Sequence, residues 1–148
     1  MKEENINIKK LNKKAIIPTY GSEYAAGADL YACIDKTELI KPGETKFIKT
    51  GIAIEIPNSL VGLIFARSGL SCKQGLAPAN KVGVIDSDYR GEIIVALYNQ
   101  SQEIREITDG DRIAQISFVP YIKGCFNEVN ELNDTHRGDG GFGSTGTK

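Results

Sequence analysis

Short apolar runs closed by turn signals are the feature that most constrains how this chain can fold. In the stretch Thr45 to Pro57, apolar and polar residues alternate, and we expect Phe47, Ile52, Ile54 and Ile56 largely on one face of strands. Comparable runs lie within residues 6–20, 60–66, 93–98, 103–107 and 112–119. Many short strands with at most one short helix indicate an all-β protein, a jelly-roll-like β-barrel or sandwich.

Turn residues separate these runs at regular intervals. Lys41-Pro42-Gly43-Glu44 and Thr108-Asp109-Gly110-Asp111 have the glycine, proline and aspartate that tight turns require. Residues 67–76 predict one or two helical turns, with Ser68 at the N-cap and Gly75 as the stop signal. Since the chain of 148 residues is long enough to bury a core, we expect residues 1–136 to form one β-barrel domain.

Residues 137–148 differ in composition from the rest of the chain. Five glycines lie among small polar residues, and Phe142 is the one large apolar side chain. Such a segment buries too little surface to offset the entropy of ordering, which predicts a flexible C-terminal tail. The simplest interpretation is a frayed end. However, Phe142 beside Arg137, Ser144 and Thr145 suits a lid that closes over a nucleotide.

Charge and cysteine content exclude several classes of protein. A formal net charge of -1 argues against direct nucleic-acid binding and against binding to a membrane surface. There is no signal peptide and no apolar run of membrane-spanning length, so a cytoplasmic protein is expected. The three cysteines form no CxxC pair, which predicts small buried side chains in a reducing compartment. His136 is the single histidine, so a histidine-rich metal site is excluded.

The segment Gly83 to Ile93 carries the densest set of chemically useful side chains. Apolar residues lead into and out of a polar turn, so the segment predicts a β-hairpin with Asp86, Asp88 and Tyr89 at its tip. A strand-to-turn junction is a rigid mount for a catalytic acid or base. Taken alone, a surface turn whose aspartates cap backbone amides is the simpler interpretation.

Two further segments offer groups that bind anions or approach a ligand closely. Arg67-Ser68-Gly69 places a guanidinium, a hydroxyl and backbone amides at the start of the predicted helical turn, although a surface ion pair would also explain Arg67. Gly27 precedes Asp29 at the entrance of a predicted strand, which indicates close approach to the backbone.

Five short segments follow one another along the chain in a particular order, and together they carry more weight than any of them alone. They are Ala26-Gly27-Ala28-Asp29-Leu30-Tyr31-Ala32, Arg67-Ser68-Gly69-Leu70, Gly83 to Ile93, Gly110-Asp111-Arg112-Ile113-Ala114-Gln115, and Arg137 to Gly146. The series resembles the five motifs of the homotrimeric dUTP diphosphatases and spans nearly the whole chain. Ala66 and Ser71 depart from the family pattern, which often has proline and alanine there.

The resemblance implies a trimeric jelly-roll enzyme with active sites between subunits. Such an enzyme hydrolyses dUTP to dUMP and diphosphate, which keeps uracil out of DNA and supplies dUMP for thymidylate synthesis. By similarity, Asp86 is the general base that activates water, and Asp88 has a structural role. Mg²⁺ is expected on the triphosphate. Asp29 would contact it through water, although fixing a local turn is an equally good role for this carboxylate.

The resemblance also implies a set of substrate-binding residues. The phosphates would be bound by Arg67, Ser68, Gly69 and Gln115, joined on closure of the tail by Arg137, Gly143, Ser144 and Thr145. Asn80, Gly83, Val84 and Ile85 would read the uracil edge, Tyr89 would exclude a 2′-hydroxyl, and Phe142 would stack on the base. Two alternatives are a deoxycytidine triphosphate deaminase of the same fold and a non-catalytic trimer that acts as a regulatory binding protein.

Overall fold

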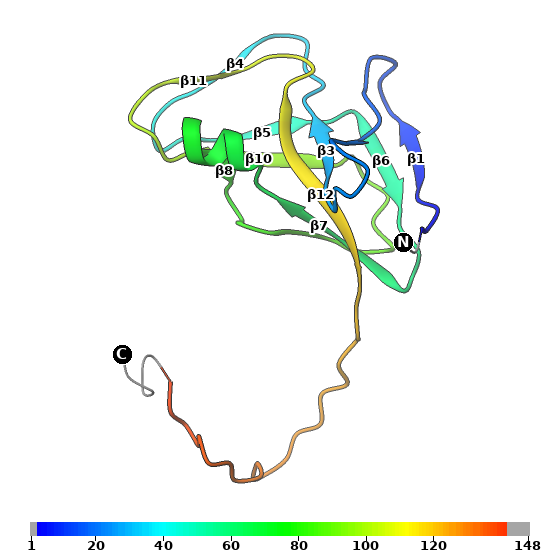
Figure 1. Ribbon diagram of the computed structural model, residues 1–148, viewed down its shortest axis with the longest axis vertical. Coiled ribbons are helices and arrows are strands. Elements are labelled where there is room, and N and C mark those ends of the chain that lie inside the picture. Colours follow the sequence, from blue (N-terminus) through cyan, green and yellow to red (C-terminus); the bar gives the residue numbers. More distant parts are fainter. Residues whose placement is uncertain (1–2, 142–148) are drawn as a thin grey trace.

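Antiparallel strands dominate the computed structural model, which describes residues 3–141 (Figure 1). The strands are β1 (Asn7–Lys10), β2 (Thr19–Tyr20), β3 (Ala28–Tyr31), β4 (Glu38–Ile40), β5 (Thr45–Lys49), β6 (Ile52–Glu55), β7 (Leu60–Phe65), β8 (Leu76–Pro78), β9 (Gly83–Ile85), β10 (Ile94–Asn99), β11 (Arg105–Ile107) and β12 (Arg112–Pro120). A single π-helical turn, η1 (Gly69–Lys73), lies between β7 and β8. The all-β prediction with one short helix is therefore confirmed.

The largest sheet has the strand order β2-β3-β12-β7-β9. Its central strand β12 pairs with β3 and β7, and Gln115 lies opposite Asp29 on one side and Phe65 on the other. Figure 1 shows β12 running the length of the body between these neighbours. Because residues opposite each other in a sheet are only a few ångströms apart, this register brings three of the sequence motifs together.

Three smaller sheets complete the body, with strand orders β5-β10-β8, β1-β6 and β4-β11. Apolar side chains from facing sheets form one continuous core, and Ile40, Leu97, Ile107 and Ile113 are almost fully buried. Two antiparallel layers packed over a shared core make a jelly-roll-like sandwich, as predicted.

The predicted turns coincide with glycines that adopt a left-handed conformation. Gly43 and Gly110 have φ values of 74° and 82°, and each lies between two strands. Gly75 follows η1 with φ 71°, and a Cβ there would lie 2.9 Å from the Cβ of Ser101. Its role as a stop signal is confirmed. Ser68 is at the N-cap of η1, but its side chain makes no capping hydrogen bond.

Two expectations about side-chain burial are wrong. Phe47 is 76% exposed, whereas its neighbour Ile48 is buried with Ile52. The reason is the period of two along β5, which places adjacent residues on opposite faces. Cys72 on η1 and Cys125 are exposed, and Cys33 alone is buried as predicted. Burial raises the pKa of the Cys33 thiol, with a smaller contribution from Asp109, so this side chain stays uncharged.

The segment 83–93 is not a paired hairpin, which corrects the prediction. Strand β9 pairs with β7, while β10 pairs with β5 and β8 in a different sheet. The apolar side chains of Val95 and Leu97 enter the core from β10, so this strand follows the second sheet. The intervening turn therefore crosses from one sheet to the other, and no strand among residues 3–141 pairs with the outer edge of β9.

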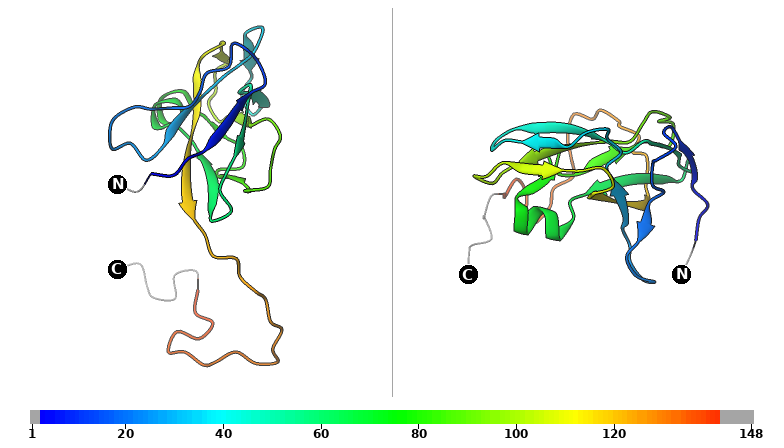
Figure 2. Two further views of the ribbon diagram at one scale, coloured as in Figure 1. Left: turned by 90° about the vertical axis from the view of Figure 1, so that its right-hand side faces the viewer. Right: turned by 90° about the horizontal axis from the view of Figure 1, so that it is seen from above.

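Beyond β12 the chain leaves the body. The last strand ends at Pro120, and the segment 121–136, which was assigned to the β domain from sequence, continues as extended chain (Figures 1 and 2). We call residues 121–141 the arm. Every residue from 121 to 139 is exposed. Among residues 3–141, no helix has both the length and the apolar character needed to cross a membrane.

Candidate active site

A buried carboxylate lies between two arginines at one end of the five-stranded sheet. The Nε of Arg67 donates a hydrogen bond to Oδ1 of Asp29 at 2.7 Å, and Nη1 of Arg112 lies 3.4 Å from Oδ2. The Asp29 side chain is only 13% exposed, so both guanidinium groups offset the cost of burying its charge. Asp29 holds Arg67 through Nε, which leaves the Nη2 donors of Arg67 for another acceptor.

Gln115 adds a polar group to the same end of the sheet. Its Nε2 donates to the carbonyl oxygen of Ala66 at 2.9 Å, next to Arg67. A Cβ at Gly27 would collide with Oε1 of Gln115, so any larger residue there would displace the Gln115 carboxamide. The close backbone approach predicted at Gly27 is thus observed, and the partner is the side chain of Gln115.

Ser68 and Gly69 follow Arg67 on the exposed surface. Apart from Gly69 itself, its chain neighbours and the backbone of η1, no atom of residues 3–141 lies within 4 Å of the position that a Cβ of Gly69 would occupy. A ligand can therefore reach the backbone of Gly69 and the hydroxyl of Ser68 without displacing other groups. Arg67, Ser68, Gly69 and Gln115, which were predicted to bind phosphate, lie together in one chain, and we call them with Asp29 and Arg112 the arginine cluster.

The residues predicted to read a base line a cavity of about 350 Å³ between the two sheets. Asn80, Gly83, Val84 and Ile85 form one wall. The free edge of β9 is part of this wall, and unpaired strand edges carry backbone donors and acceptors that can bind a ligand. A Cβ at Gly83 would lie 3.2 Å from the Cβ of Ile64, so the floor is closely packed.

Sequence reasoning missed the opposite wall of this cavity. It is made by Phe47 on β5, Pro78 on β8 and residues 94–96 on β10. The sequence did contain a signal for this wall, because the apolar run of β10 directly follows the turn that carries Asp86 and Asp88, which we call the acidic turn. The prediction of a hairpin obscured it, since paired strands would leave no space between β9 and β10.

Two exposed carboxylates follow β9 in the turn between the sheets. Asp86 and Asp88 line a cavity of about 670 Å³ together with Ser87 and Val84. The backbone N–H of Tyr89 donates to the carbonyl oxygen of Asp86 at 3.2 Å, which closes the turn. Both carboxylates thus border the same cavity, and a proton acceptor at either position would be accessible to water.

Side chains brace this turn from both ends. The hydroxyl of Tyr89 donates to the carbonyl oxygen of Glu92 at 3.0 Å, and its ring occupies the space that a side chain at Gly91 would need. Nη1 of Arg90 donates to the carbonyl oxygens of Ser87 and Tyr89 at 2.6 and 3.0 Å. The turn is therefore a preorganised support for its carboxylates.

The arginine cluster and the acidic turn are separate within one chain. No hydrogen bond or ion pair among residues 3–141 joins Arg67 to Asp86 or to its neighbours in the turn. Arg137 lies in a turn of the arm and donates from Nε to the carbonyl oxygen of Gly140 at 2.8 Å. Phe142, Gly143, Ser144 and Thr145, predicted to close over the nucleotide, lie outside the described residues.

Comparisons with known proteins identify the family of this chain. The chain is 54% identical over 136 residues to the deoxyuridine 5'-triphosphate nucleotidohydrolase of Desulfitobacterium hafniense, covering 91% of this chain and 90% of that protein. A dUTPase mutant of Staphylococcus bacteriophage 80alpha, solved with dUpNHpp, superimposes with a TM-score of 0.86 at 28% identity, covering 98% of this chain and all of that chain.

A further solved relative concerns a metal ion. A dUTPase mutant from phage phi11 of S. aureus, which coordinates a structural Mg(II) ion, matches with a TM-score of 0.76 at 27% identity, covering 87% of this chain and 99% of that one. The family model described as dUTPase matches residues 13–146 of this chain, nearly its whole length. The chain therefore belongs to the dUTPase family.

Proposed function

We propose that this chain hydrolyses dUTP to dUMP and diphosphate, with Asp86 as the general base. The observation that carries the proposal is the continuity of β9 with the acidic turn. The free edge of β9 borders the pocket between the two sheets, and Asp86 follows directly after Ile85. Base recognition and a catalytic carboxylate thus share one rigid support, held by Tyr89 and Arg90.

The pocket explains selection of a deoxyuridine. Backbone groups of Gly83 and Ile85, with the carboxamide of Asn80, read the polar edge of uracil. A side chain at Gly83 would already meet Ile64 at 3.2 Å, so the floor has little spare room and the added methyl of thymine would overpack the site. Tyr89, fixed by its bond to Glu92, supports the deoxyribose and excludes a 2′-hydroxyl.

The reaction is a displacement at the α-phosphorus. Asp86 accepts a proton as the oxygen of a water molecule bonds to this phosphorus, and the bond to the bridging oxygen breaks, releasing diphosphate. Arg67, Ser68 and Gln115 hold the phosphates, and Asp29 keeps Arg67 in place through Nε. Positioning and charge stabilisation supply most of the catalysis in such phosphoryl transfers.

Mg²⁺ would be held at this site mainly by oxygen atoms of the substrate phosphates. Among residues 3–141 there is no group of three or more acidic, cysteine or histidine side chains that could enclose a metal ion. Both carboxylate oxygens of Asp29 already face arginines, so Asp29 would approach the ion only through water. When bound, the ion neutralises phosphate charge that develops as diphosphate leaves.

We further propose that the active form is a homotrimer in which the arm of one chain lies on the next. The arm exposes large apolar side chains, among them Ile122 at 96% and Leu132 at 87%, and Phe126 is fully exposed. Residues 121–132, if extended, reach about 40 Å. This exceeds the radius of gyration of a body of this size, about 14 Å, so the arm can reach another chain.

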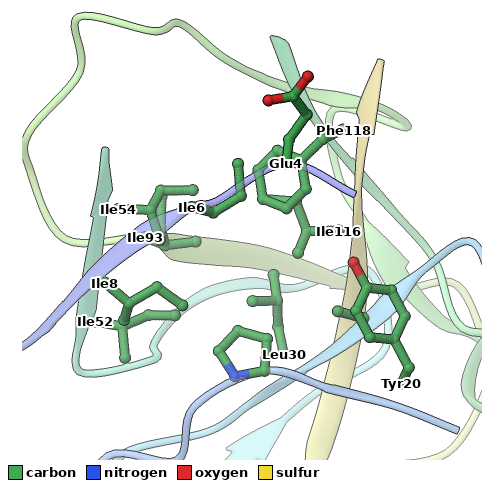
Figure 3. A pocket seen from close by; sticks show the side chains of 12 residues that line it. Glu4, Ile6, Ile8, Tyr20, Leu30, Ile52, Ile54, Ile93, Ile116 and Phe118 are labelled. Atoms are coloured by element: carbon green, nitrogen blue, oxygen red, sulfur yellow. The ribbon is translucent and has the colours of Figure 1, made fainter. Parts of the chain in front are cut away.

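An apolar cavity beside β1 has the right chemistry to receive such an arm. It has a volume of about 200 Å³, and Figure 3 shows Ile6 and Ile8 facing Leu30, Ile116 and Phe118 across it. Its walls come from β1, β3, β6 and β12, with Tyr20 and Glu4 at the rim. Each copy offers one arm and one cavity, and such head-to-tail contacts form a closed ring of three when each copy is rotated by about 120° from the next. A ring also allows the arginine cluster of one chain to meet the acidic turn of another.

Substitution of the arm tests the trimer. The double variant Ile122→Ser with Phe126→Ser removes apolar area that binding would bury, so we expect sedimentation to show dissociated chains at micromolar concentration. Leu39→Ser is the matched control, since Leu39 is 51% exposed on β4, outside the cavity. A double variant that sediments as the unmodified protein does would refute docking of the arm.

A substrate panel tests the reaction. With Mg²⁺, we expect diphosphate release from dUTP at least about 10²-fold faster, in kcat/KM, than from dTTP, UTP or dCTP. Chelation of the metal should lower the rate on dUTP. Equal rates on all four nucleotides would contradict the recognition proposed for β9, and ammonia release from dCTP would identify a deaminase instead.

A further inference from the structure

Lys81 has a backbone conformation that no other non-glycine residue among residues 3–141 adopts, with φ of 65°. The N–H of Val82 donates to the carbonyl oxygen of Asn80 at 2.7 Å, so Lys81 is the central residue of a γ-turn. A γ-turn with positive φ is the strained form, and such strain persists only where the surrounding structure enforces it.

The topology explains why the chain turns so sharply at this point. Residues 79–82 connect β8 in the three-stranded sheet to β9 in the five-stranded sheet. Ala79 is still held by its N–H to the carbonyl oxygen of Ala96 at 2.7 Å, and Lys81 donates to the carbonyl oxygen of Pro78 at 3.0 Å. A β-turn over residues 78–81 therefore overlaps the γ-turn over residues 80–82, and the chain changes sheets within four residues.

The turn also sets the position of Asn80. The carboxamide Nδ2 of Asn80 lies 3.4 Å from the point that a Cβ of Gly83 would occupy, and both residues line the pocket between the sheets. Asn80 is exposed, and no hydrogen bond among residues 3–141 fixes its side chain. Its place over Gly83 thus depends on the backbone of the γ-turn.

We infer that Lys81 is a positioning residue for nucleoside recognition, whose left-handed backbone holds the Asn80 carboxamide over the edge of β9. The inference rests on the proposed function for its substrate, but the turn itself can be tested without catalysis. The side chain of Lys81 is exposed, so the positioning role belongs to its backbone and not to its ammonium group.

Three substitutions at Lys81 distinguish an effect of its backbone conformation from an effect of its side-chain charge. Lys81→Gln removes the charge, Lys81→Gly permits the conformation freely, and Lys81→Val opposes it because a β-branched residue at positive φ is strongly disfavoured. We expect Lys81→Val to raise KM for dUTP about tenfold with kcat changed less than about threefold, since the interaction contributes to binding. Lys81→Gln and Lys81→Gly should keep KM within about twofold of the original value. Lys36→Val is the matched control, an exposed lysine in another connection.

A double-mutant cycle with Asn80→Ala tests whether Lys81 changes KM by acting through Asn80. If Lys81 acts through Asn80, adding Lys81→Val to Asn80→Ala should raise KM little further. A full additional tenfold increase would overturn the inference, as would an equal effect of Lys81→Gln and Lys81→Val.

Hydrogen exchange at the Val82 amide gives a readout that does not depend on dUTP hydrolysis. We expect protection of this amide in the unmodified protein and in Lys81→Gln, and faster exchange in Lys81→Val. An unmodified protein that fails to hydrolyse dUTP but protects Val82 would refute the proposed function and not the turn. Equal exchange in all variants would refute the turn.

Discussion

Asp86→Asn should bind dUTP with nearly unchanged affinity and lose turnover by about 10³-fold, because an amide cannot accept the proton of the attacking water. The carboxamide keeps the size of the side chain. The turn should also keep its shape, since Tyr89 bonds to the backbone oxygen of Asp86 and Arg90 to other carbonyls of the turn. Single-turnover kinetics and binding of dUpNHpp would separate the chemical step from affinity.

Asp88→Asn is the matched control for this variant. Asp88 lies two residues further along the same turn, is equally exposed, and lines the same cavity. We expect it to retain kcat within about threefold of the unmodified protein, in line with a structural role. If Asp88→Asn were the inactive variant and Asp86→Asn the active one, the general base would have to be reassigned to Asp88.

Deletion of residues 137–148 should lower kcat/KM by at least about 10²-fold while the body stays folded. In the proposed function, this segment would supply Arg137, Ser144 and Thr145 for the phosphates and Phe142 for the base, and it follows the last strand of the described body in sequence. Steady-state kinetics should show the loss. Unchanged thermal unfolding and sedimentation would show that the body and the remaining arm, residues 121–136, are intact.

Arg137→Ala in the chain of 148 residues distinguishes phosphate binding by the Arg137 charge from simple coverage of the site by residues 137–148. If the segment works mainly by binding phosphate, this variant should reproduce a large part of the loss caused by the deletion. Full activity of the truncated protein would contradict a lid. A truncated protein that no longer forms the oligomer would instead assign residues 137–148 to assembly.

Local signals in the sequence were sufficient for the elements but not for their pairing. Glycine identified the turns at Gly43, Gly75 and Gly110, since positive φ is a property of the single residue. The apolar run after the acidic turn correctly gave β10. However, the hairpin prediction failed because the partner of β10 is chosen by the core, through Val95 and Leu97, and not by the nearest strand in sequence.

The order of the motifs, and through it the family and the candidate residues, followed from the sequence by itself. Tertiary structure decided what each residue touches. Asp29 was equally well explained from sequence as a metal contact or a turn residue, and the fold places it between Arg67 and Arg112, 38 and 83 positions away. Likewise, the pocket at β9 exists only because β9 and β10 belong to different sheets. Contacts between distant positions depend on strand register and packing, which are properties of the whole core and have no local signature.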